Sequence, residues 1–282
     1  FRYVKCAECG CLRLLDVPAD MTRYYDQSYY SIRRESRLRA WARQNPAAFR
    51  LGYRFVTRQR LGLPEWWPAR RGGRNQSILD VGCGRGNLLL RLQTLGFTSL
   101  LGIDPFIAAD ITYRSGLRIL RRSLPETEGR FDVIVMNHSF EHMPRPFEVL
   151  REAARHLAPG GLVMIRTPVA SSWAWREYGP NWVQLDPPRH LHVHTEMSIK
   201  CLARAAELTV DSVLYDSTAL QFWGSEQYRR DIPLMDRRSY LSSPRRSIFA
   251  RTEIDEFERK ARELNRAGEG DQACFYLTSR LR

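Results

Sequence analysis

A glycine-rich turn between two carboxylates is the feature of this sequence with the clearest chemical meaning. The apolar run Ile78–Val81 leads into glycines at alternate positions, which are Gly82, Gly84 and Gly86. Glycine allows the backbone to turn tightly and a ligand to approach it closely. Asp80 in this run and Asp104 directly after the next run, Leu100–Ile103, add two carboxylates. Because a carboxylate accepts several hydrogen bonds, the pattern predicts a ligand with a cationic group and a ribose.

The same residues argue against a dinucleotide site. The dinucleotide-binding fingerprint places a glycine at position 87, where this sequence has Asn87. A carboxylate at the strand end, here Asp80, also disfavours a pyrophosphate at that place. An ordinary turn with two hydrated acids is the simpler alternative, but it does not explain why one acid lies near the end of one apolar run and another directly after the next.

Histidines gather in one part of the chain, which includes His138, His142, His156, His190, His192 and His194. Imidazole is the most common general base because its pKa lies near neutrality. His190 follows Pro187, Pro188 and Arg189, and the prolines restrict the loop that carries it. His190 is therefore the predicted general base, with a purely structural hydrogen bond as the alternative. His142, preceded by Glu141, is the second candidate, with a role in shaping the ligand pocket as its alternative.

Metal binding is not predicted. His190, His192 and His194 alternate along the chain and could share one face of an extended segment, but no fourth ligand is evident. Cys6-x-x-Cys9 could form half of a zinc knuckle, and a second cysteine pair is absent from the sequence. We therefore expect no metal site.

Short β-branched runs alternate with helical patterns between residues 77 and 217, which is typical of βαβ units around a parallel sheet. The predicted strands are Ser77–Val81, Ser99–Ile103, Leu117–Leu120, Phe131–Asn137, Leu162–Thr167, Leu208–Tyr215 and Gln272–Ser279. The predicted helices between them are Asn87–Leu95, Pro146–Leu157 and Glu196–Glu207, the second stopped by Pro159-Gly160-Gly161. The fold class is therefore α/β.

Composition divides the chain into four parts. Residues 1–76 form a segment rich in Cys, Tyr and Arg, predicted to be a helical cap, and residues 77–218 form the α/β core. Residues 219–269 are polar and helical in pattern, and we expect a helical insertion that covers the acceptor site or a dimer contact. Residues 270–282 contribute the final strand of the core sheet. The chain is expected to be a monomer or a homodimer.

Charge is concentrated near the N-terminus. The net charge is +13, from 44 Lys and Arg against 31 Asp and Glu, and most of the excess lies in residues 1–76. A codon bias toward Arg is the preferred explanation of this charge, and an anionic partner near the N-terminal segment is the alternative. Aromatic residues in the basic stretch 33–60 recur at helical spacing, so packing explains them better than nucleic-acid binding does. No apolar run is long enough to span a membrane and no signal peptide is evident, so we expect a cytoplasmic protein.

The glycine turn and the residues after it resemble motifs of the class I S-adenosylmethionine-dependent methyltransferases. The resemblance spans residues 77–217 and includes Asp80-x-Gly82-x-Gly84-x-Gly86, Asp104, Phe131–Val135, Glu141–Pro144 and Leu157–Leu162. A further segment, Trp182-x-x-Leu185-Asp186-Pro187-Pro188-Arg189-His190-Leu191, resembles a bacterial subgroup that is often encoded near genes for sugar or secondary-metabolite assembly. The family fold is a mostly parallel, Rossmann-like sheet of seven strands with helices on both faces and an antiparallel last strand.

This resemblance implies roles for individual residues. Gly82, Cys83, Gly84 and Asn137 would line the methionyl part of S-adenosylmethionine, and Gly86 would complete the turn. Asp80 would lie near the amino group of the cofactor, and Asp104 would bind the ribose. Pro105 and Phe106 would flank the adenine, with Ser123 and Leu124 at its edge. On the acceptor side, the resemblance points to Tyr30, Trp182 and Arg189, the last as a clamp for a phosphate or carboxylate.

The predicted function is methyl transfer from S-adenosylmethionine to a hydroxyl or amine of a small molecule. A sugar, a nucleotide-linked sugar or a natural-product scaffold is the expected acceptor. Two alternatives remain open, an RNA methyltransferase that uses the basic N-terminal segment and a catalytically idle subunit that binds the cofactor.

Overall fold

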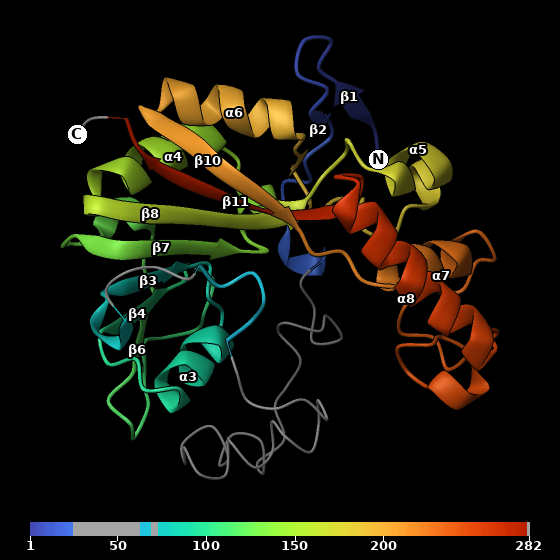
Figure 1. The fold of residues 1–282 in the computed structure, drawn as a ribbon, viewed down its shortest axis with the longest axis horizontal. Coiled ribbons are helices and arrows are strands. Elements are labelled where there is room, and N and C mark those ends of the chain that lie inside the picture. The colour runs from blue at the N-terminus through green and yellow to red at the C-terminus, as the bar shows by residue number, and fades with distance from the viewer. Residues whose placement is uncertain (25–62, 69–72, 281–282) are drawn as a thin grey trace.

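The structure is a computed structural model that describes residues 1–24, 63–68 and 73–280 (Figure 1). Tyr30 and the basic stretch 33–60 of the predicted N-terminal cap lie outside these residues. The described N-terminal part begins with β1 (Tyr3–Lys5) and β2 (Leu12–Leu14), which pair with β9 (His192–Val193) in a small antiparallel sheet. The short helix η1 (Thr22–Tyr24) ends the first described range, and η2 (Gly73–Asn75) begins the third.

Eight strands form the main sheet. Their spatial order is β10 (Leu208–Tyr215), β11 (Gln272–Ser279), β8 (Leu157–Pro168), β7 (Phe131–Asn137), β3 (Ile78–Val81), β4 (Leu100–Ile103), β6 (Arg118–Leu120) and β5 (Ile111–Thr112). Strands β8, β7, β3, β4 and β6 are parallel, and β11 is antiparallel to both of its neighbours. The predicted α/β class is confirmed, but the count of seven strands is wrong by one. The additional strand, β5, spans two residues, too few to show an alternating pattern.

Helices cover both faces of this sheet (Figure 1). Helix α3 (Asn87–Thr94) lies on one face, where Leu89 and Leu92 are fully buried. Helices α4 (Pro146–Arg155) and α6 (Glu196–Ala205) lie on the other face and contact each other. A larger cluster of buried aliphatic and aromatic side chains lies between these two helices and the sheet, so the sheet has an apolar core on each side.

Strand β8 begins earlier than the sequence pattern predicts. Helix α4 ends at Arg155, and Pro159-Gly160-Gly161 lies within β8 rather than simply after the helix. The pairing with β7 explains this, because Phe131 lies opposite Leu157 whereas Val133 lies opposite Leu162. The irregularity between these pairs accommodates the extra residues of β8, as a β-bulge does.

A group of helices lies beyond one end of the sheet (Figure 1). It contains α5 (Trp173–Tyr178), η5 (Gly179–Asn181), α7 (Leu220–Tyr228), η6 (Pro244–Arg246) and α8 (Arg251–Arg266). Three of these helices, α7, η6 and α8, lie in the chain between β10 and β11, within the predicted insertion 219–269. Aromatic side chains join this group, including a stacked pair of Phe222 and Phe257 with ring centroids 5.3 Å apart.

Within residues 1–24, 63–68 and 73–280, no helix has both the length and the apolar composition that a bilayer crossing requires.

Candidate active site

The candidate site lies at the carboxyl ends of the parallel strands β3, β4 and β7, where open α/β sheets bind ligands. Asp80 pairs with Gly102 in β4 and Val135 in β7, so it lies in the middle of the sheet. Asp104 follows β4 and Asn137 ends β7. The topology therefore brings three predicted cofactor residues from three different strands to one edge.

The glycine turn after β3 is held by backbone hydrogen bonds. The N–H of Gly82 donates to the carbonyl of Ile103 at 2.9 Å, and the N–H of Gly86 donates to the carbonyl of Cys83 at 2.9 Å. Gly84 has a φ of 55°, and a Cβ built on it would meet no atom within 4 Å. The backbone at Gly84 is therefore open, whereas a Cβ on Gly86 would lie 2.5 Å from Ile119 Cδ1.

Asp104 organises the neighbouring loop with both carboxylate oxygens. Its Oδ2 accepts a hydrogen bond from the N–H of Gly84 at 2.9 Å, and its Oδ1 accepts one from the N–H of Phe106 at 2.8 Å. Each oxygen retains a second lone pair for a ligand. Beside it, the side chain of Phe106 is 91% exposed, an unusual position for a large aromatic ring. Pro105 is exposed next to it.

Asp80 is a buried carboxyl group. It is 3% exposed, and burial together with the nearby charge of Asp104 raises the pKa of Asp80 to about 7. A cation placed against it would favour the ionised form and lower this pKa. Cys83, in the turn between them, has a thiol whose pKa is raised by burial, so it is a neutral side chain there.

The predicted adenine-edge residues have other contacts. Ser123 caps the short helix η3 (Leu124–Glu126), and its hydroxyl donates to the Glu126 carboxylate at 2.7 Å. Leu124 is 4% exposed and packs in the apolar core. The side chain of Leu124 is therefore buried in the core and does not lie at the surface of the site.

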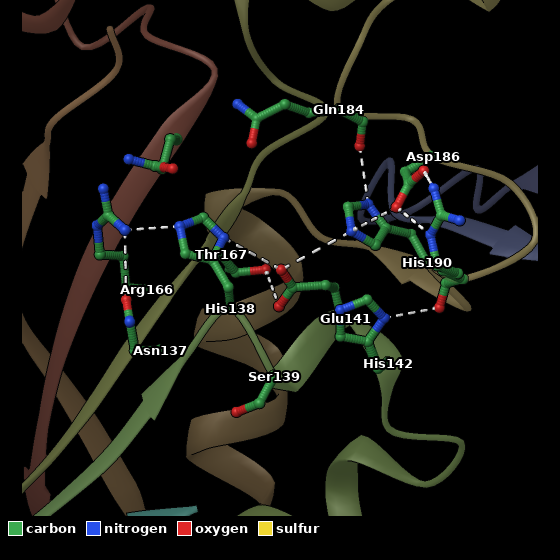
Figure 2. A network of polar contacts seen from close by, with 12 residues as sticks. Asn137, His138, Ser139, Glu141, His142, Arg166, Thr167, Gln184, Asp186 and His190 are labelled. Atoms are coloured by element: carbon green, nitrogen blue, oxygen red, sulfur yellow. Dashed lines mark hydrogen bonds and ion pairs between the residues drawn. The ribbon is translucent and has the colours of Figure 1, made fainter. Parts of the chain in front are cut away.

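A second polar group lies after β7, on the short helix η4 (Phe140–His142), and is drawn in Figure 2. Glu141 is fully buried, and its Oε2 accepts a hydrogen bond from the hydroxyl of Thr167 at 3.1 Å. Its Oε1 has no hydrogen-bond partner among the described residues, and His138 Nδ1 lies 3.4 Å away as a long contact. Burial by itself raises the pKa of Glu141, but His138 and His142 outweigh it and hold this pKa below its usual range.

His142 and His190, the two predicted catalytic histidines, lie together beside Glu141 (Figure 2). Their ring centroids are 4.9 Å apart, and His190 Nε2 lies 4.0 Å from Glu141 Oε1. Both rings donate Nδ1–H to a backbone carbonyl at 2.8 Å, His142 to Arg189 and His190 to Gln184. Burial lowers the pKa of His190 to about 4, so this ring is neutral near pH 7. His142 is the more exposed of the two.

The loop that carries His190 contains an internal ion pair between Arg189 and Asp186. Arg189 Nε donates to Asp186 Oδ2 at 2.8 Å, and the same guanidinium also pairs with Asp186 Oδ1. Another N–H of Arg189 reaches the carbonyl of Tyr24 at 3.1 Å. Arg189, the predicted clamp for an anion, is thus already paired within the protein. The same loop is held to η4 by a hydrogen bond of 2.9 Å from the N–H of Leu191 to the carbonyl of Glu141.

Trp182, predicted on the acceptor side, lies in the interior. It is 1% exposed, and its indole N–H donates to Asp271 Oδ2 at 2.9 Å. This placement makes it a support for the loop rather than a surface for an acceptor.

One residue near the site, Arg166, was not predicted from the sequence. Arg166, near the end of β8, donates to His138 Nε2 at 2.6 Å and to Asn137 Oδ1 at 3.3 Å. Its Nε also pairs with Asp216 at 2.7 Å (Figure 2 labels Arg166, His138 and Asn137). An arginine inside an otherwise apolar strand pattern is the signal that could have identified it.

The three alternating histidines do not converge. His192 and His194 stack on each other with ring centroids 5.8 Å apart, and His194 also stacks on Phe140. His190 points instead toward His142. Within the described part of the chain, the His, Cys, Asp and Glu side chains whose potential metal-ligand atoms converge are Glu141, His142 and His190.

Comparison with known proteins gives one family. The family described as "Methyltransferase domain" matches residues 33–213. The chain is 34% identical over 113 residues to a ubiquinone biosynthesis O-methyltransferase of Pseudomonas paraeruginosa, covering 36% of this chain and 48% of that protein. It is also 34% identical over 106 residues to the 27-O-demethylrifamycin SV methyltransferase of Amycolatopsis mediterranei, covering 33% of this chain and 38% of that protein. The chain thus matches less than half the length of these curated relatives.

Solved structures are more distantly similar. An O-methyltransferase from a trans-AT PKS multienzyme of Brevibacillus brevis has a TM-score of 0.49 at 14% identity, covering 88% of this chain and 81% of that one. A cyclopropane synthase of Mycobacterium tuberculosis has a TM-score of 0.44 at 16% identity, covering 72% and 78%. The family match itself covers more than half of the sequence and includes the glycine turn, both strand-end acids and Glu141. The chain therefore belongs to the methyltransferase domain family.

Proposed function

We propose that this protein transfers a methyl group from S-adenosylmethionine to a hydroxyl or amine of a small molecule. The observation that carries the proposal is the arrangement around Asp104. Its carboxylate accepts hydrogen bonds from the backbone N–H groups of Gly84 and Phe106, and it retains lone pairs for a ribose.

The residues at this edge fit S-adenosylmethionine. Asp104 can accept hydrogen bonds from the two ribose hydroxyls, and Phe106 with Pro105 can cover the adenine. The open main chain at Gly84 leaves room for the methionyl part. The buried carboxyl of Asp80 suits an ammonium group, because a cation compensates the unfavourable burial of its charge. When bound, the cofactor supplies a methyl group on a positively charged sulfur.

The protein contributes position and proton removal. Methyl transfer is an in-line displacement, so holding the acceptor atom against the methyl group accounts for much of the rate. A hydroxyl acceptor must also lose its proton as the new bond forms. Glu141 and His142 follow β7, the strand next to Asp80, and the loop before β9 brings His190 beside them. This polar group could receive that proton. His142 is its most exposed member, so the acceptor would meet it first.

The proposal includes the chemical class of the acceptor. The two named relatives above are both O-methyltransferases by description, which supports an oxygen acceptor on a small organic molecule. Within that class we favour a sugar, a nucleotide-linked sugar or a natural-product scaffold. The engaged guanidinium of Arg189 gives no particular support to an anionic acceptor.

The test begins with calorimetric titration of S-adenosylmethionine, followed by transfer of a labelled methyl group to a panel of sugars, nucleotide sugars, phenols and tRNA. Binding together with labelling of a small molecule supports the proposal. Labelling of tRNA alone would point to an RNA methyltransferase, and binding without labelling in any pool, including extracted metabolites, would point to an idle subunit. Absence of binding would overturn the proposal.

A further inference from the structure

Three electron-pair donors face one another beside the proposed acceptor position. They come from Glu141, His142 and His190, and their potential ligand atoms all lie within 4.8 Å of one another. Both histidines donate Nδ1–H to a backbone carbonyl, so the proton of each neutral ring is on Nδ1 and the lone pair is on Nε2. For His190, this Nε2 is the atom that lies 4.0 Å from Glu141 Oε1.

The carboxylate in this group is poorly satisfied. Glu141 is 0% exposed, and its Oε1 has no hydrogen-bond partner among the described residues, with His138 Nδ1 as a long contact at 3.4 Å. A separation of 4.0 Å is too long for a hydrogen bond between Glu141 and His190. A buried charge without full pairing is costly, and a cation between these atoms would remove that cost.

The hydrogen bonds made by these three side chains are typical of metal ligands. Imidazoles that bind a metal through one nitrogen usually donate the other N–H to a carbonyl or carboxylate, as both rings do here. The second oxygen of Glu141 is oriented by Thr167 at 3.1 Å. Ligands of a tetrahedral zinc ion lie about 3.4 Å apart, so side-chain movements of about 1 Å would complete the site.

We propose that Glu141, His142 and His190 bind a divalent transition-metal ion, with Zn²⁺ as the best match to two imidazoles and one carboxylate. The remaining coordination position is open to the oxygen of the acceptor. This role of the metal, unlike metal binding itself, rests on the proposed function. Bound there, the hydroxyl would ionise more readily and release its proton to solvent, so with the metal bound the three ligands would not themselves act as the base. Its oxygen would then attack the methyl carbon while the carbon–sulfur bond breaks and the electron pair stays on sulfur, giving a methyl ether and a thioether.

The test uses protein purified without an oligohistidine tag and stripped with a chelator. Cys6 and Cys9 are both replaced by serine, because these cysteines could bind zinc independently. Zn²⁺ is titrated by calorimetry, and Co²⁺ is titrated by visible absorption, which reports on coordination by nitrogen and oxygen. Glu141→Gln and His142→Gln test the ligands, and His192→Gln is the matched control.

We expect one equivalent of Zn²⁺ in the serine background, lost or weakened by about 100-fold or more in each ligand variant and unchanged in the control. Absence of a binding equivalent in the serine background would overturn the proposal, as would an affinity that neither ligand variant changes. Circular dichroism tests whether each variant is folded. If Glu141→Gln does not fold, His142→Gln still tests the metal site, because His142 is only half-buried. Titration of S-adenosylmethionine in parallel separates failure of the metal site from failure of the proposed function.

Discussion

Trp182 and Asp271, both buried, are joined by a hydrogen bond of 2.9 Å from the indole N–H to the carboxylate Oδ2. The same oxygen accepts a hydrogen bond from the side chain of Gln184 at 2.7 Å, and the carbonyl of Gln184 accepts the Nδ1–H of His190. The position of His190 thus depends on a carboxylate supplied by the segment that precedes the last strand.

We predict that Trp182→Phe destabilises the protein by about 1–3 kcal/mol, because a buried carboxylate loses one donor. Urea denaturation followed by circular dichroism measures this change. Trp175→Phe is the control, since Trp175 is a partly buried neighbour whose ring centroid lies 6.0 Å from that of Trp182. Equal effects of the two substitutions would show that the hydrogen bond contributes nothing beyond packing.

Asp104→Ala should weaken binding of S-adenosylmethionine by at least about tenfold, because hydrogen bonds to a charged group are worth roughly 1.5–3 kcal/mol each. Calorimetric titration measures the affinity. Asp110→Ala is a suitable control, since Asp110 accepts a backbone hydrogen bond from Arg121 on a nearby exposed loop. An affinity unchanged in Asp104→Ala would contradict the assignment of the cofactor site.

Stability should depend on pH through His190. Burial lowers its folded-state pKa to about 4, so its contribution is fully present above the unfolded value of about 6.5 and is lost as the pH falls toward 4. We expect metal-free wild-type protein to lose on the order of 2–3 kcal/mol relative to His190→Gln over this range. Denaturant titrations at about pH 7 and about pH 4.5, with chelator present, give the comparison. A difference between the two proteins that does not vary with pH would contradict a neutral buried ring.

Asp80 should give the stability of the protein a pH dependence of the opposite sign. Its folded-state pKa is raised to about 7, so its contribution is present below about pH 4 and is lost as the pH rises through 7. Relative to Asp80→Asn, the wild type should lose on the order of 2–4 kcal/mol between about pH 4 and pH 7. The two groups titrate over overlapping ranges, so the wild-type profile alone should be flatter than either variant comparison.

Gly86 and Ile119 should be energetically coupled. Gly86→Ala places a side chain at a φ of 74° and a Cβ 2.5 Å from Ile119 Cδ1. Ile119→Val removes that Cδ1 and should cost about 1 kcal/mol in the wild type, but much less in the Gly86→Ala background. A double-mutant cycle by thermal or urea denaturation measures this coupling, and strictly additive effects would show that the clash is relieved in another way.

The sequence patterns predict most of the core accurately. Strands β7, β10 and β11 have the predicted boundaries, since each is a continuous run of mostly apolar or β-branched residues bounded by polar or turn residues. The sequence pattern predicts a wrong strand boundary where the pairing of strands, rather than residue type, determines where a strand begins, as at the start of β8. There, Gly160 and Gly161 lie in the irregular part of β8, between the pairs Phe131–Leu157 and Val133–Leu162, so they belong to the strand although their residue types suggest a turn.

The site is only partly predictable for a similar reason. The two histidines and Glu141 are each identifiable, but their convergence depends on a loop folding back onto η4. The hydrogen bond from Leu191 to Glu141 that holds it is between backbone atoms, and such contacts have no signature in residue types. The burial of Trp182 is likewise a tertiary property, because a conspicuous aromatic residue in a loop motif is equally compatible with the surface.

Strand β11 lies between β10 and β8, both of which precede it in the chain. On the ribosome, β8 and β10 are therefore made before the strand that joins them, and each presents an unpaired edge to the cell until β11 emerges. The central sheet is completed only after β11 has been made, so the nascent chain passes through a stage at which two strand edges are open to other polypeptides. Chaperone demand during synthesis should therefore be greatest just before residues 272–279 leave the ribosomal tunnel.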